Sequence, residues 1–203
     1  MDITVGVMAL QGDFREHISV LKSCGIKTLE IRFPHQLEHA DGLVIPGGES
    51  TAMVKLINKY DFKNALDKFH NRKKPVFGTC AGMILLSKSA EGSDFTLGYI
   101  DIEVKRNAYG RQIDSFEQLV ELKNAFLPGS NFFKAVFIRA PQIKKIGNNV
   151  EILARFNNYP VMVREDNVIA CSFHPELTDD MRIHNYFIDM VKNSVNMIQS
   201  VCK

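Results

Sequence analysis

The sequence predicts an α/β fold in a single domain, residues 1–203, with a mostly parallel central sheet. The main observation is that apolar runs of strand length alternate with stretches of helical periodicity. In addition, residues 3–10 are almost continuously apolar, as in a strand that is covered on both faces. Finally, no repeat, low-complexity tract or Pro/Gly-rich linker is long enough to separate two domains.

A strand–helix–strand unit opens the chain. After the strand at 3–10, the turn formed by Gln11 and Gly12 leads to Asp13, which we expect to cap a helix. Apolar residues recur at i, i+4 and i+7 in that helix, and Gly25 is well placed to end it before a second strand at 26–32. The apolar positions of the helix are Phe14, Ile18 and Leu21.

The next strand, at 42–46, runs into a turn with two adjacent glycines. This turn has the sequence P-G-G-E-S-T at 46–51, and the spacing of Met53, Leu56 and Ile57 behind it indicates a helix. The double glycine releases the backbone from the usual steric limits at this point.

A short strand at 74–79 and a helix at 81–88 place Cys80 at the junction between them. Further strands are expected at 99–104, 116–122, 135–139, 150–156, 161–164 and 168–173, the later ones antiparallel. A last helix, at about 179–198, should pack on the sheet through His184, Phe187, Ile188, Val191, Val195 and Ile198.

The composition is that of an ordinary globular domain. The chain has 25 Lys and Arg against 23 Asp and Glu, and this net charge of +2 is too small to predict binding to nucleic acid or to anionic membranes. No apolar run approaches the roughly 18 to 20 residues that cross a bilayer, and the N-terminus lacks a signal-like segment. We therefore expect a cytoplasmic protein that binds neither nucleic acid nor membranes.

The cysteines are widely spaced and form no C-x-x-C pair, so they predict neither a zinc site nor a disulfide framework. We expect no metal and no cofactor. The four positions are Cys24, Cys80, Cys171 and Cys202.

Cys80 lies in the segment G-T-C-A-G, with a glycine two residues away on each side. The pattern resembles a nucleophile elbow, in which a sharp turn exposes the nucleophile and the glycines remove Cβ atoms that would clash. The free N–H groups at the start of the following helix favour a thiolate and can hold an oxyanion. The simpler interpretation is a small buried hydrophobic residue, as most free cysteines are.

A base and its orienting partner are found in S-F-H-P-E at 172–176. In extended chain, residues two apart project to the same side, so Glu176 can reach the ring of His174 and leave its other nitrogen for Cys80. Both ends of this triad follow strands, and ligands bind at the carboxyl ends of strands in open α/β sheets. By itself H-P-E would be a solvated turn pair. No other histidine has a comparable position near a strand end.

The turn at 46–51 also has two interpretations. It is either a plain strand–helix connector or a second wall of an oxyanion site, in which a glycine amide approaches a substrate carbonyl closely. In the second case Glu49 and Ser50 are placed to bind an amino or carboxylate group. The spacing of a nucleotide-binding P-loop is absent.

Taken together, G-T-C-A-G, S-F-H-P-E-L and P-G-G-E-S-T resemble the motifs of class I glutamine amidotransferases. Further blocks are similar to the glutaminase subunit of pyridoxal 5'-phosphate synthase: L-Q-G at 10–12, R-N-A-Y-G at 106–110, D-S-F-E at 114–117 and I-R-A-P at 138–141. Other class I members commonly carry Gln four residues after the nucleophile, whereas this chain has Ile84, which fits the pyridoxal branch. Asp13, Phe14 and Cys171 depart from common family residues.

The resemblance implies the three-layer flavodoxin-like fold of class I glutamine amidotransferases and the hydrolysis of L-glutamine to L-glutamate and ammonia. It implies a triad of Cys80, His174 and Glu176, in which Cys80 forms a thioester. Backbone N–H groups of Gly48 and Ala81 are implied to hold the oxyanion. The residues implied to bind glutamine are Gly48, Glu49, Ser50, Arg106, Ile138 and Arg139.

A partner is also expected, because ammonia is largely protonated at neutral pH and has to reach a second active site through a protected passage. The resemblance implies a (β/α)₈-barrel pyridoxal 5'-phosphate synthase subunit in a large hetero-oligomer. In the family, the loop with Gln11 and Gly12 lies near the partner contact.

Two other classes stay open. One is another cysteine-dependent amide hydrolase or amidotransferase subunit on the same fold. The other is a non-catalytic interaction protein, which would have lost members of the triad, and all three are present in this chain.

Overall fold

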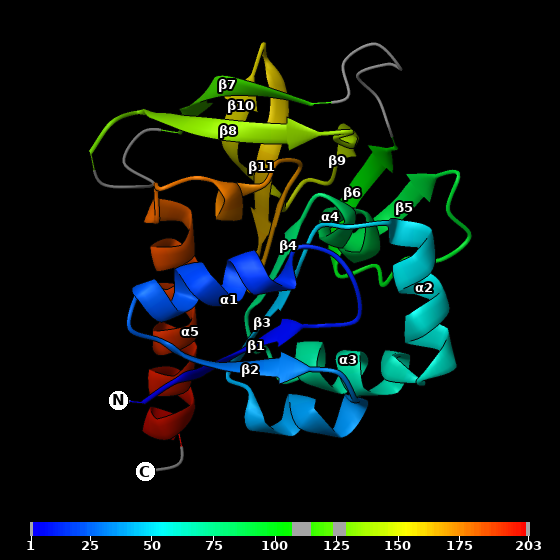
Figure 1. Ribbon diagram of the computed structural model, residues 1–203, viewed down its shortest axis with the longest axis vertical. Helices are drawn as coiled ribbons and strands as arrows, with labels where there is room; N and C mark the ends of the chain where they lie inside the picture. Colours follow the sequence, from blue (N-terminus) through cyan, green and yellow to red (C-terminus); the bar gives the residue numbers. More distant parts are fainter. Residues whose placement is uncertain (1, 107–114, 124–128, 202–203) are drawn as a thin grey trace.

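The computed structural model describes residues 2–106, 115–123 and 129–201 (Figure 1). Within these residues, nine strands form one sheet, whose first five strands are parallel and whose remaining strands are antiparallel. The expected α/β fold, with antiparallel strands in the C-terminal half, is confirmed. In spatial order the strands are β2 (Lys27–Ile31), β1 (Thr4–Met8), β3 (Gly42–Ile45), β4 (Val76–Thr79), β12 (Val168–Cys171), β11 (Tyr159–Glu165), β10 (Glu151–Phe156), β7 (Ser115–Leu122) and β8 (Phe132–Ile138).

Helices and a smaller sheet surround the nine-stranded sheet. The small sheet has the order β5 (Ser87–Glu91), β6 (Ile100–Lys105), β9 (Gln142–Ile146). The α-helices are α1 (Phe14–Ser23), α2 (Ser50–Lys59), α3 (Phe62–Asn71), α4 (Ala81–Leu86) and α5 (Arg182–Val201), and two 3₁₀ turns are η1 (Pro34–His39) and η2 (Pro175–Leu177).

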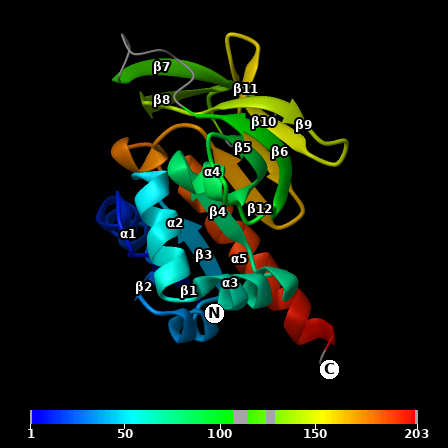
Figure 2. The ribbon, with the colours of Figure 1, turned by 90° about the vertical axis from the view of Figure 1, so that its right-hand side faces the viewer.

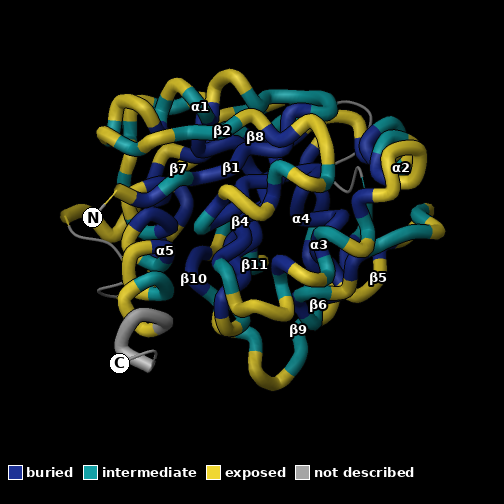
Figure 3. The backbone as a smooth tube through the Cα atoms, turned by 90° about the horizontal axis from the view of Figure 1, so that it is seen from below, coloured by how far each residue is buried: buried dark blue, intermediate teal, exposed yellow. Residues whose placement is uncertain are grey.

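Two apolar clusters lie on opposite faces of the large sheet and produce a layered arrangement (Figures 1 and 2). On one face, Leu21 of α1 and Phe187 of α5 pack in the same cluster as Val7 of β1. On the other face, Met53 of α2 and Leu66 of α3 share a cluster with Met8. Because neighbouring residues of a strand point to opposite faces, the apolar strands supply both clusters. Figure 3 shows the central strands buried and the outer turns of α1 and α2 exposed.

Several elements differ from the sequence-based expectation. Helix α3 was not predicted, although Phe62, Leu66 and Phe69 are buried at i, i+4 and i+7. The helix expected at 81–88 ends at Leu86, because the hydroxyl of the buried Ser87 donates to the carbonyl of Ile84 and the chain then enters β5. Strand β9 was also not predicted, since it is short and buries one of its five residues, Ile143.

The last helix is confirmed. Its residues His184, Phe187, Ile188 and Val191 are buried and Val195 is partly buried, whereas the side chain of Ile198 lies outside the described residues. None of the helices in the described part of the chain combines the length and the apolar character needed to cross a membrane.

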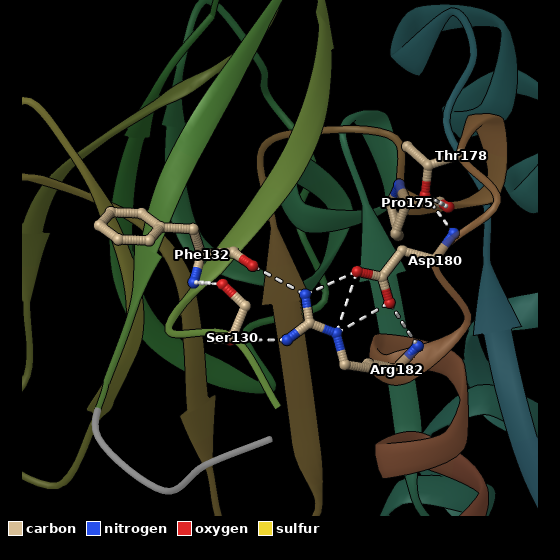
Figure 4. A network of polar contacts seen from close by, with 6 residues as sticks. All are labelled: Ser130, Phe132, Pro175, Thr178, Asp180 and Arg182. Carbon is tan, nitrogen blue, oxygen red and sulfur yellow. Dashed lines mark hydrogen bonds and ion pairs between the residues drawn. The ribbon is translucent and has the colours of Figure 1, made fainter. Parts of the chain in front are cut away.

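A polar network ties the start of α5 to the chain before β8 (Figure 4). The guanidinium of Arg182 donates to the carbonyls of Ser130 and Phe132 at 2.7 Å each, and it also binds both carboxylate oxygens of Asp180. Thr178 donates to the carbonyl of Pro175 at 3.0 Å. The network therefore holds the segment that directly follows His174.

Candidate active site

Cys80 occupies the turn between β4 and α4 in a strained backbone conformation, with φ 47° and ψ −102°. This is unusual for a residue with a side chain and is typical of a nucleophile elbow. A Cβ on Gly82 would clash with the carbonyl of Ile45, and one on Gly78 would lie 2.7 Å from the carbonyl carbon of Gly82. The two glycines that flank Cys80 therefore allow α4 to pack tightly behind the turn.

His174 follows β12, which pairs in parallel with β4, so both strands end at the same edge of the sheet. Its ring is 3% exposed, and its Nδ1 atom lies 2.8 Å from Oε1 of Glu176. Burial opposes the imidazolium, but hydrogen bonds with Asp13, Cys80 and Glu176 outweigh it and raise the ring's pKa to about 12. The ring is thus held by carboxylates at Nδ1 and lines the same cavity as Cys80.

Glu176 is itself buried, and burial raises the pKa of its carboxyl although the contact with His174 works in the opposite direction. Since Nδ1 of His174 is engaged by carboxylates, Nε2 is the ring nitrogen left for Cys80. The three residues therefore form one continuous arrangement of thiol, imidazole and carboxylate.

A cavity of about 300 Å³ opens beside Cys80 and His174. A larger hollow of about 540 Å³ lies along β7 and β10, but no cysteine or histidine lines it. Every site residue predicted from the sequence lines the smaller cavity except Glu176, which lies behind His174. These residues are Gln11, Gly12, Gly48, Glu49, Ser50, Cys80, Ala81, Arg106, Ile138, Arg139 and His174.

The double-glycine turn forms one wall of this cavity. The side-chain oxygen of Gln11 accepts a hydrogen bond of 2.8 Å from the N–H of Glu49, and a Cβ on Gly48 would clash with that oxygen. Glu49 caps α2 by accepting from the N–H groups of Thr51 and Ala52, of which the first does most to lower the pKa of the Glu49 carboxyl. An exposed carboxylate thus stands at the cavity rim.

The opposite wall comes from the ends of β6 and β8. Arg106 donates to the carbonyl of Gly92 at 2.8 Å and lies 3.8 Å from the carboxylate of Glu49. Arg139 has a positive φ of 43°, and the thiol of Cys80 lies 3.8 Å from the carbonyl oxygen of Ile138. The structure thus brings both arginines, one from each wall strand, to the same cavity. Residues 107–110 and 114 lie outside the described residues.

Asp13 has a position that the sequence did not predict. It stands at the N-cap of α1, as expected, but its side chain makes no capping hydrogen bond and instead lies 3.3 Å from Nδ1 of His174. Within the described residues, Asp13, His174 and Glu176 are the set whose ligand atoms are close enough to share a metal ion. Because both carboxylates point at the same ring nitrogen, the arrangement suits proton transfer better than metal binding.

Comparison with known proteins agrees with this geometry. Residues 7–193 match the SNO glutamine amidotransferase family. The chain is 51% identical over 189 residues to "Pyridoxal 5'-phosphate synthase subunit PdxT" of Thermotoga petrophila, covering 93% of this chain and 99% of that protein. It is 48% identical over 195 residues to the protein of the same name from Oenococcus oeni, covering 96% and 100%.

Solved structures agree as well. A structure described as a glutamine amidotransferase superposes with a TM-score of 0.86 at 45% identity and covers 93% of this chain and 98% of its own. A putative GMP synthase component from Thermoplasma acidophilum superposes with a TM-score of 0.71 at 18% identity, covering 98% of each chain, and shows the fold alone. With this match over nearly the whole chain, the protein belongs to the SNO glutamine amidotransferase family.

Proposed function

We propose that this protein hydrolyses L-glutamine through Cys80, His174 and Glu176 and that the ammonia it releases is used to make pyridoxal 5'-phosphate. Family membership and about 50% identity to PdxT proteins support the glutaminase activity and its place in this synthesis. The observation that carries the residue assignment is that Cys80 and His174, at the ends of two paired strands, line the same cavity, while Nδ1 of His174 is bound to the Glu176 carboxylate.

The reaction begins at the thiol–imidazole pair. His174 accepts the proton of the Cys80 thiol as the sulfur attacks the carboxamide carbon of glutamine, and a tetrahedral adduct forms. The N–H of Ala81 is the first of α4 and has no acceptor within its helix, so it is available to bind the oxyanion together with the N–H of Gly48.

His174 then donates its proton to the departing nitrogen, ammonia leaves, and a γ-glutamyl thioester remains on Cys80. Next, the neutral His174 removes a proton from water, whose oxygen attacks the thioester and releases glutamate and the Cys80 thiolate. Glu176 stabilises the imidazolium each time it forms. The cycle consumes one glutamine and one water and yields one glutamate and one ammonia.

The cavity walls suit the other end of the substrate. Glutamine carries an α-ammonium and an α-carboxylate, which match the carboxylate of Glu49 and the guanidinium groups of Arg106 and Arg139. Gly48, Ser50 and Ile138 complete the proposed glutamine site. Residues 1–203 act in this proposal as one glutaminase domain without metal or cofactor.

The partner in this proposal is a (β/α)₈-barrel pyridoxal 5'-phosphate synthase subunit in a large hetero-oligomer. The relatives' name, synthase subunit, supports an assembly. Gln11 and Gly12 are the proposed contact, since they line the cavity and pack against the double-glycine turn, where a Cβ on Gly12 would clash with the carbonyl of Gly47. Docking there would act directly on the oxyanion site.

The test is glutamate formation by wild type and by Cys80→Ala, each with and without a synthase subunit. We expect the substitution to lower the rate by at least ~10³-fold. A variant that still forms glutamate at near the wild-type rate would rule out Cys80 as the nucleophile.

A further inference from the structure

Two buried histidines stand behind the triad, on the side away from the cavity. Nε2 of His17, in α1, lies 3.3 Å from Oε2 of Glu176 and 3.1 Å from the hydroxyl of Thr79. Nδ1 of His17 lies 3.0 Å from Nε2 of His184, in α5. Both rings are 0% exposed. The chain of polar contacts that starts at Cys80 thus continues through Glu176 to a histidine pair in the core.

Both histidines are neutral. Burial and the neighbouring rings of His184 and His174 hold the pKa of His17 well below its usual value, and burial lowers the pKa of His184 to about 4. A neutral imidazole carries one N–H and one bare nitrogen. Each of the two rings therefore donates from one nitrogen and accepts at the other. Which nitrogen of each ring carries the hydrogen can be deduced from the groups that surround it.

One order fits the contacts best. If His17 carries its proton on Nε2, which faces both the Thr79 hydroxyl and the Glu176 carboxylate, its Nδ1 accepts from Nε2–H of His184, and Nδ1 of His184 is left as a bare acceptor. That atom has no hydrogen-bond partner among the described residues, as this order requires. The opposite order would bury an unpaired N–H on His184 and turn the lone pair of His17 toward the carboxylate. Both consequences are costly in the core.

Glu176 needs such a donor. Its Oε1 is bound to His174, whereas Oε2 is buried and receives no well-aligned hydrogen bond from the described residues. His17 is the group that faces Oε2, at 3.3 Å.

We propose that His17, held in its donating tautomer by His184, is a positioning residue that orients the Glu176 carboxylate and keeps it ionised for its work on His174. This inference rests on the proposed triad. His17 lies four residues after Asp13 on the same helix, so α1 contacts the His174–Glu176 pair from two sides. Since Glu176 acts on His174 and not on glutamine, His17 should affect turnover and its pH dependence more than substrate binding.

The titratable groups around this carboxylate come from every element packed on it. Asp13 and His17 come from the α1 side, His174 from its own turn, and Cys171 from β12. His184 on α5 lies against His17 and the ring of Phe77. Of these groups His17 faces Oε2, and since its ring also contacts Thr79 and His184, variants of His17 have to be compared with each other.

Two amide substitutions at His17 distinguish the loss of the hydrogen bond to Glu176 from a change in packing. In His17→Gln the side-chain amide reaches the position of Nε2 and can still donate to Glu176, whereas in His17→Asn it reaches only the position of Nδ1. We expect His17→Asn to lower kcat for glutamine, with the synthase subunit present, on the order of 10–100-fold, the size of a lost hydrogen bond to a charged group. KM should change less than about threefold, and His17→Gln should recover most of the rate.

The pH profile provides a second measurement. Without the N–H of His17 the Glu176 carboxylate is less stable, so it takes up a proton at higher pH, and the acid limb of kcat/KM moves upward in His17→Asn but not in His17→Gln. Equal rates and equal profiles for the two variants would overturn the proposal, and so would a wild-type rate in His17→Asn.

Two controls keep the result interpretable. If His17→Asn does not fold, as judged by its thermal unfolding, His184→Gln and His184→Asn give the same comparison one step further out, with a smaller shift in the same direction. Here too, identical profiles count against the proposal. If Cys80→Ala keeps its glutaminase activity, the proposed triad itself is wrong. If activity requires Cys80 but is unchanged in the His17 variants, only this inference is wrong.

Discussion

The backbone N–H of Cys80 donates a hydrogen bond of 2.8 Å to the carbonyl oxygen of Cys171, three residues before His174. This bond extends the parallel pairing of β4 and β12 by one step beyond the last pair, Thr79 and Cys171. Cys80 and His174, the proposed nucleophile and base, lie 94 positions apart in the sequence and leave the sheet from neighbouring strands that are hydrogen-bonded to each other. The distance between them is set by the sheet and not by loop conformation.

The close packing of α4 makes a prediction about Gly82. In an ordinary helix, replacing Gly by Ala stabilises by up to about 1 kcal/mol. At Gly82 the new Cβ meets the carbonyl of Ile45, so we expect Gly82→Ala to destabilise the fold by about 1–3 kcal/mol and to reduce glutaminase activity. Urea unfolding and the glutaminase assay measure both. Gly25→Ala is the control: φ is +75° there but the space is open, so it should cost about 1 kcal/mol and leave activity unchanged.

The strained turn at Cys80 predicts a conflict between stability and activity. Glycine accepts a positive φ without strain, which is worth about 1–2 kcal/mol, and this outweighs the greater freedom it gives the unfolded chain. We therefore expect Cys80→Gly to be inactive but at least as stable as Cys80→Ala in urea unfolding. A Cys80→Gly protein clearly less stable than Cys80→Ala would mean that the turn is not strained.

The buried histidine His184 predicts a loss of stability in acid. Its pKa is about 4 in the folded protein and about 6.5 when unfolded. Between these values the unfolded state binds more protons, so the free energy of unfolding falls as the pH drops from about 6.5 to 4. His184→Gln removes this proton uptake. Urea titrations at pH 7 and 4.5 should show a smaller difference for the variant than for wild type, and equal differences would contradict a neutral, buried ring.

The polar contacts of Arg182 predict that its planar, forked guanidinium is needed for full stability of the fold (Figure 4). Lysine cannot reach the carbonyls of Ser130 and Phe132 and the carboxylate of Asp180 at once. We expect Arg182→Lys to lower the free energy of unfolding by about 1–3 kcal/mol. Arg155→Lys is the matched control, because Arg155 is exposed and donates to the carbonyl of Asn158. Its cost should stay below about 0.5 kcal/mol, and similar losses in both would show that the network adds no stability.

Differences in thiol environment predict selective alkylation. Burial raises the pKa of Cys171 well above its usual value, and its side chain is 0% exposed. Cys80 lines the cavity and contacts His174. Iodoacetamide at pH 7 should therefore modify Cys80 and spare Cys171, as read by peptide mass spectrometry. Glutamine should protect Cys80, and equal labelling of the two thiols would contradict this assignment.

Much of the fold and of the candidate site could be predicted from the amino-acid sequence alone. The spacing of Gly78, Cys80 and Gly82 predicts a strained turn, because only glycine fits the close approach at the two flanking positions. The pair His174 and Glu176 is likewise local, since residues two apart in extended chain face the same side. Helix α3 was readable as well, from Phe62, Leu66 and Phe69, but was not predicted.

The remaining features depend on contacts between segments that are distant in sequence. Asp13 contacts His174 and does not cap its own helix. His17 and His184 line up behind Glu176. Both arrangements arise only when α1, β12 and α5 pack around the same edge of the sheet. No local pattern encodes the tautomer of a buried ring, because it depends on partners supplied by other elements. The sequence by itself determined which groups are proposed to do the chemistry. The tertiary structure decided which of them are charged, because burial and long-range neighbours set the protonation of each group.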